Sequence, residues 1–134
     1  MDTSDPAPTY EIVDTPAGQM IILPPDGDVF ERAEDFMDLV GNASWQSIAW
    51  VVVPAERVAD DFFRLRTGFA GEVAQKFVNY RVGLAVLGDI DRFSATSPTL
   101  RDLMRESNDG RQLWFVHDRA GLDAKIDRLG PTRP

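Results

Sequence analysis

Three uninterrupted apolar runs constrain the fold of this chain more than any other feature. Residues 48–53 read IAWVVV, residues 82–87 read VGLAVL, and the shorter third segment, residues 112–116 (QLWFV), is apolar from Leu113 onward. Strands without polar alternation are typical of a sheet that is buried on both faces. Segments with helical spacing of apolar residues separate the runs, and strands that alternate with helices imply parallel pairing through right-handed crossovers. The sequence therefore predicts an α/β protein.

A β-hairpin is predicted ahead of these runs. Residues 10–14 alternate in polarity, residues 15–18 (TPAG) carry a turn signal, and residues 19–23 return as a second strand. The hairpin adds an antiparallel edge, so we expect a mixed sheet with the element order β-β-α-β-α-β-α-β-α.

Capping signals locate the first predicted helix. Asp28 is its predicted N-cap, with Glu31 as the capping-box partner three residues later. Gly41 and Asn42 are predicted to end it, because both residues are common at helix C-termini.

Three further helices are predicted after the first buried run. A loop over residues 54–66 leads to a helix that starts at Thr67, and Ser97 is the predicted N-cap of a helix whose first residue is Pro98. Residues 120–129 form the predicted closing helix, and Gly130-Pro131 ends it.

Length and composition fit one domain. We expect this domain over residues 10–130 of the 134, with tails at residues 1–9 (MDTSDPAPT) and 131–134. The net charge is −8, with 22 acidic and 14 basic residues and no basic run, which argues against nucleic acid as a partner. We find neither a signal-peptide pattern nor an apolar run that could span a bilayer, so we expect a cytoplasmic protein without a membrane partner. The absence of cysteine excludes disulfides and thiolate metal sites.

Residues 65–72 (LRTGFAGE) carry two glycines at a predicted helix start. Gly68 and Gly71 share one face of the first turn, so one interpretation is that they let the helix lie close to the sheet, with Thr67 as N-cap. The alternative is an anion site, because Arg64 and Arg66 share a side ahead of the unpaired N–H groups of the helix start. The glycine spacing matches neither a phosphate-binding loop nor a dinucleotide fingerprint.

The same region carries a resemblance to a known family. Residues 61–72 (DFFRLRTGFAGE), 75–81 (QKFVNYR), 105–108 (RESN) and 113–116 (LWFV) resemble the bacterial family called domain of unknown function 4180, over residues 10–129. This resemblance implies little about function.

A more distant likeness is to the STAS domains of anti-sigma-factor antagonists and anion-transporter tails, and it rests on the element order. In the antagonists, a strand leads to Asp-Ser-Ser-Gly at a helix start, and a kinase phosphorylates the serine before the glycine. Thr67-Gly68 occupies the matching place, while Leu65 stands where the acid would be and Arg66 replaces the first serine. The likeness implies a regulatory module with Thr67 as its modified residue.

Other polar residues follow the buried strands. Asp89 and His117 lie at predicted strand ends, where open α/β sheets usually bind ligands. His117 could act as a general acid or base, or be a surface loop residue. Asp89 and Asp91 could hold Mg²⁺, or form a solvated turn. We assign no catalytic residue, metal or cofactor, because no serine lies in a nucleophile elbow and no phosphate-binding loop is present.

The sequence thus supports two hypotheses about function. The first is a regulatory or protein-interaction module that is controlled by an anion or by phosphorylation at Thr67, with Arg64, Arg66 and Gly68 beside it. The second is a protein or enzyme that binds a nucleotide or phosphorylated metabolite in a strand-end crevice formed by Asp89, His117 and Arg66. We expect a protein partner under the first hypothesis and leave a homodimer open.

Overall fold

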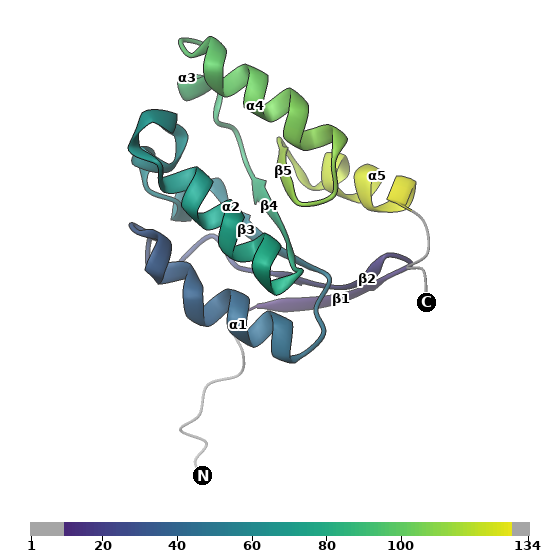
Figure 1. Cartoon of the computed structure of the whole chain (residues 1–134). Coiled ribbons are helices and arrows are strands. Elements are labelled where there is room, and N and C mark those ends of the chain that lie inside the picture. The colour runs from purple at the N-terminus through teal and green to yellow at the C-terminus, as the bar shows by residue number, and fades with distance from the viewer. Residues whose placement is uncertain (1–9, 130–134) are drawn as a thin grey trace.

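The computed structural model describes residues 10–129 and contains a five-stranded mixed sheet with the order β1-β2-β3-β4-β5 (Figure 1). The strands are β1 (Glu11–Thr15), β2 (Gly18–Ile22), β3 (Trp50–Pro54), β4 (Gly83–Leu87) and β5 (Leu113–Val116). β1 and β2 form the predicted antiparallel hairpin, and β2 to β5 are parallel. The α/β class and the mixed sheet are therefore confirmed, while both predicted tails lie outside the described residues.

The helices cover the two faces of the sheet unequally (Figure 1). Side chains of α1 (Met37–Trp45), α2 (Phe69–Tyr80) and α4 (Pro98–Asp109) share one core with the sheet, whereas α5 (Arg119–Leu129) packs on the opposite face. All five residues of β3 are buried, since this strand lies between both layers. Burial on both faces is what the apolar runs predict.

The first predicted helix starts later than Asp28, and that prediction is wrong. Phe30 instead forms an isolated parallel bridge with Val58, and a 3-10 helix, η1 (Ala33–Phe36), leads into α1. The capping carboxylate belongs to Asp35, which accepts hydrogen bonds from the amides of Glu31 (2.9 Å) and Arg32 (3.0 Å). These two bonds, together with the charge of Arg32, lower the pKa of Asp35 below its ordinary value of 3.8, against a smaller opposing effect of burial.

The predicted helix end at Gly41-Asn42 is also wrong, because α1 continues to Trp45. Ala43 is fully buried against the core, so continuing the helix adds to the apolar surface that α1 covers. The helix ends where Ser47 adopts a left-handed conformation (φ 59°) and the amide of Ile48 bonds to the carbonyl of Ala43 at 2.8 Å. Ser47 therefore takes the place that glycine usually holds in such a terminus.

The connections carry more structure than the predicted order includes. A short helix, α3 (Asp91–Ser94), separates β4 from α4, so the order contains one helix more than predicted. The predicted loop between β3 and α2 contains three 3-10 helices, which are η2 (Ala55–Arg57), η3 (Asp60–Phe63) and η4 (Leu65–Thr67). Phe62 and Phe63 hold this segment on the core, since they are 1% and 2% exposed.

Two side chains secure α4 and the edge strand β5. Ser97 caps α4 as predicted, because its hydroxyl accepts from the amide of Leu100 at 3.1 Å. At the other end of α4, the side-chain oxygen of Asn108 accepts from the amide of Phe115 (2.8 Å), and its nitrogen donates to the carbonyl of Phe115 (3.2 Å). Asn108 thus pairs with the outer edge of β5 much as a further strand would.

None of the helices within residues 10–129 combines the length and apolar character needed to cross a membrane.

Candidate functional site

The two glycines of residues 65–72 have different roles from the one predicted. Gly68 has a φ of +80°, and a Cβ added at Gly68 or at Gly71 would meet nothing within 4 Å. Neither glycine therefore lets the helix approach the sheet, and the predicted close packing is wrong. Gly68 is needed for its left-handed backbone, which ends η4 and precedes the first residue of α2, whereas Gly71 is exposed.

Thr67 lies in η4, two residues ahead of α2, and its side chain ties this turn together. Its hydroxyl lies 2.8 Å from the carbonyl oxygen of Asp61 and 2.9 Å from that of Arg64, so its one proton is shared between them. The same oxygen accepts from the amide of Phe69 at 3.3 Å. The predicted bond to the first turn of the helix is therefore present, although Gly68 holds the N-cap position.

An open hollow of about 960 Å³ lies beside this turn, and we call it the arginine hollow. Arg64 lines it from between η3 and η4, Arg66 from η4, and Arg92 from α3. Arg64 pairs with Asp61 and Arg92 with Asp60, each at 3.2 Å, while within residues 10–129 Arg66 forms no ion pair. The complete lining is Asp60, Phe63, Arg64, Leu65, Arg66, Thr67, Arg92, Phe93, Thr96, Ser97 and Thr99.

The N-terminus of α4 faces the arginine hollow, since Ser97 and Thr99 line it and the first turn of α2 does not. We expected the positive end of α2 to be at this site, and the structure places α4 there instead. Helix N-termini and arginine side chains both stabilise anions, so the hollow has the chemistry of an anion site in a chain whose net charge is −8.

Arg92 was not predicted as a site residue, because α3 is only four residues long, and the α4 terminus, although predicted at Ser97, was not assigned to the site. A helix of one turn shows no apolar periodicity, so the sequence analysis predicted no helix around Arg92, between β4 and α4. The available signal was the capped start of α4 at Ser97, which places Arg92 near a helix N-terminus.

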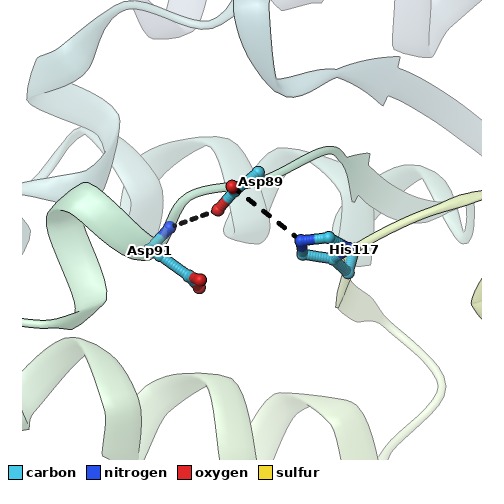
Figure 2. Close-up of side chains that lie close together, drawn as sticks. All are labelled: Asp89, Asp91 and His117. Carbon is cyan, nitrogen blue, oxygen red and sulfur yellow. Dashed lines mark hydrogen bonds and ion pairs between the residues drawn. The ribbon is translucent and has the colours of Figure 1, made fainter.

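A second group of polar side chains lies at the carboxyl ends of β4 and β5. Figure 2 shows Asp89 between Asp91 and His117, with one carboxylate oxygen accepting from the amide of Asp91 at 2.9 Å. The other oxygen lies 3.9 Å from Nε2 of His117. One ligand atom from each of the three residues lies within 4.8 Å of the others, and all three side chains are exposed. We call these residues the strand-end cluster.

The two sites are neighbours, yet the predicted crevice does not form as one unit. A smaller hollow of about 290 Å³ contains Asp89 and shares Phe63, Arg92 and Phe93 with the arginine hollow. Arg66 lies in the larger hollow, and His117 lies beside Asp89 through their contact at 3.9 Å. The structure therefore brings Asp89 and His117 together and places Arg66 apart from them.

Fold and site together define a class, namely an α/β domain with polar side chains gathered beyond the carboxyl ends of its parallel strands. Within this class, the chain belongs to the family described as a domain of unknown function (DUF4180), whose family model matches residues 16–126. The predicted family resemblance is thus confirmed, and the match includes both sites. Comparisons with curated proteins and with solved structures find no match.

Proposed function

We propose that this protein is a STAS-like regulatory module that binds a phosphate-bearing anion in the arginine hollow and thereby controls its contact with a protein partner. The observation that carries the proposal is the convergence of Arg64, Arg66 and Arg92 on one hollow beside a helix N-terminus. Guanidinium groups bind phosphate oxygens through pairs of parallel hydrogen bonds. Arg66 forms no ion pair in the described part of the chain and can offer its whole guanidinium, whereas Arg64 and Arg92 each keep a pair with an aspartate and offer their remaining N–H groups.

Ligand binding is better supported than phosphorylation of Thr67. Thr67 is exposed, so a kinase could reach it, but its hydroxyl already bonds to the carbonyls of Asp61 and Arg64. A phosphate on this oxygen would remove the donated proton and place negative charge beside two carbonyl oxygens. Modification would therefore loosen η4, whereas an anion in the hollow leaves these bonds intact.

Calorimetric titration of the purified protein with inorganic phosphate and with inorganic pyrophosphate tests anion binding. We expect saturable binding that Arg66→Gln weakens at least tenfold, because a hydrogen bond to a charged group contributes about 1.5–3 kcal/mol. Arg128→Gln on α5 is the matched control, since it removes the same charge from a distant exposed helix. Equal weakening by both variants would show attraction to overall charge rather than binding in the hollow.

The partner contact is tested separately by affinity capture with and without pyrophosphate. Trp45 supports a protein contact, because its side chain is 89% exposed at the end of α1 while Trp50 and Trp114 are buried. We expect a captured partner whose yield changes with pyrophosphate and falls in Trp45→Ala. Mass spectrometry of protein from its native cells addresses the alternative, since a phosphate on Thr67 under any growth condition would favour modification.

The second hypothesis is a small-ligand protein or enzyme. It also requires binding of a phosphate group, but this group belongs to a nucleotide or phosphorylated metabolite. The volume of about 960 Å³ supports it, because hollows of that size accommodate small organic ligands. A thermal-shift panel of nucleotides and sugar phosphates separates the two hypotheses. A ligand at 100 times its Kd stabilises the protein by about 2.7 kcal/mol, and such a shift without a captured partner would favour the small-ligand hypothesis.

A further inference from the structure

We propose that the strand-end cluster, Asp89, Asp91 and His117, is a binding site for one first-row divalent transition-metal ion such as Zn²⁺ or Co²⁺. This inference is independent of the anion proposed for the arginine hollow. It replaces our expectation of no metal, which considered Asp89 and Asp91 without His117 and rested on the lack of a phosphate-binding loop.

The geometry of the cluster suits simultaneous coordination. Its ligand atoms lie within 4.8 Å of one another, and ligands on one metal at bonds of about 2.0–2.2 Å are separated by roughly 3–4 Å. The exposed side chains therefore need to rotate by only a small amount to close around an ion. In Figure 2 the carboxylate of Asp91 and the ring of His117 flank the same open side of Asp89.

Hydrogen bonding leaves the required atoms available. Asp89 uses one oxygen to accept from the amide of Asp91, so its second oxygen, which faces Nε2 of His117, can bind the metal. The other ring nitrogen, Nδ1, lies 3.8 Å from a carboxylate oxygen of Asp118. A carboxylate beside the second nitrogen is a common companion of metal-bound histidine, because it fixes the ring and its tautomer.

The local charge favours a cation. Asp89, Asp91 and Asp118 surround the single imidazole, and Glu56 lines the small hollow that contains Asp89. Arg92 also lines this hollow, but its guanidinium pairs with Asp60 at 3.2 Å. Within residues 10–129, none of the three aspartates forms an ion pair with lysine or arginine, so a divalent ion would relieve the repulsion among them.

The donor set selects the class of metal. Oxygen ligands alone suit Mg²⁺ and Ca²⁺, and exposed carboxylates bind such ions weakly. A neutral imidazole adds affinity for Co²⁺, Ni²⁺ and Zn²⁺, which prefer nitrogen ligands. His117 follows β5 whereas the two aspartates follow β4, and the parallel pairing of β4 with β5 brings these segments together.

The single histidine makes the test specific. His117 is the only histidine in the chain, so the imidazole signals of untagged protein in a ¹H–¹⁵N NMR spectrum belong to one residue. Addition of one equivalent of Zn²⁺ should shift its Nε2 signal, and calorimetry should give one site that binds Zn²⁺ at least tenfold more tightly than Mg²⁺.

Variants distinguish this site from general attraction to an acidic protein. His117→Ala and Asp89→Asn should each weaken Zn²⁺ binding at least tenfold, and His117→Ala should leave the weak Mg²⁺ binding unchanged. Asp102→Asn on α4 is the control, because it removes an exposed carboxylate outside the cluster and should change neither affinity. Circular dichroism checks that each variant folds. We expect all of them to fold, because the substituted side chains are exposed. An unmoved imidazole signal, or equal Zn²⁺ affinity in His117→Ala, would overturn the proposal.

Discussion

Replacement of Gly83 by alanine tests the packing of the sheet face that α5 covers. Gly83 lies directly opposite Trp50 in the pairing of β4 with β3. A Cβ at position 83 would lie 2.5–2.7 Å from three atoms of the Trp50 indole, namely Cδ2, Cε3 and Cε2. Contacts of that length do not occur in folded proteins, so the ring must move.

The indole of Trp50 has little freedom to move. It stacks on Trp114 with the ring centroids 3.8 Å apart, and Nε1 of Trp114 donates to the carbonyl of Gly110 at 2.8 Å, which fixes the second ring. Overpacking of this kind costs about 1–3 kcal/mol. Alanine is better than glycine in a strand by roughly 0.5–1 kcal/mol, so the middle of the two ranges leaves an expected net loss of about 1 kcal/mol.

Urea unfolding of four proteins measures this loss and its cause. The set is the natural chain, Gly83→Ala, Trp50→Leu and the double variant, because a double-mutant cycle isolates the contact between the two positions. Leucine removes the atoms that the new Cβ would meet, so Gly83→Ala should cost at least about 1 kcal/mol less in the Trp50→Leu background. The same cost in both backgrounds, or no cost in the natural chain, would refute the packing argument.

Three further predictions concern single residues. Gly68→Ala should destabilise the protein by about 1–2 kcal/mol, because Gly68 has a positive φ. Gly71→Ala should stabilise it by about 0.5–1 kcal/mol, because this helix position is exposed and open. Equal effects of the two variants in urea unfolding would contradict this difference. Asn108→Ala should lower the unfolding free energy by about 1–3 kcal/mol and speed hydrogen exchange at the amide of Phe115, since that amide loses its acceptor. Unchanged exchange would count against the contact between Asn108 and the edge of β5. The stability contributed by Asp35 should be fully present above its ordinary pKa of 3.8 and be lost as the pH falls through the lowered pKa of the folded state. The difference in unfolding free energy between the natural chain and Asp35→Ala should therefore shrink in that pH range. A difference that is independent of pH would exclude the carboxylate hydrogen bonds as its source.

The sequence predicts the strands well because burial on both faces of a strand produces a short continuous apolar run, which few other structures share. The run at residues 48–53 corresponds to β3 (Trp50–Pro54), and the run at 82–87 to β4 (Gly83–Leu87). Helix ends are predicted less well, because several residues near each end have the required chemistry. We predicted Asp28 as the cap, whereas the capping carboxylate is that of Asp35 at the third position of η1, and Phe30 pairs with Val58 where the helix was expected.

The candidate sites are predicted only in part: Arg64 and Arg66 were expected to share an anion site, but Arg92 and the N-terminus of α4 were not. Asp89 and His117 could be expected at one edge, because neighbouring parallel strands end there together. The arginine hollow depends on the path of irregular segments, and no local pattern encodes how η4 approaches α3. The glycines of residues 65–72 show the same limit, since positive φ and close packing favour the same residue type.

The strand order explains why the hollow forms from connections rather than from the sheet. In many α/β proteins the ligand crevice opens where the strand order reverses and successive crossover helices lie on opposite faces. Here β2, β3, β4 and β5 follow one another across the sheet, and α1, α2 and α4 all pack on the same face. This arrangement has no reversal and therefore lacks the usual crevice. Binding groups at the carboxyl edge must come from the segments that follow the strands, and those after β3 and β4 contain Arg64, Arg66 and Arg92. Affinity at this edge should accordingly depend on the 3-10 segment and on α3, and much less on substitutions within the strands themselves.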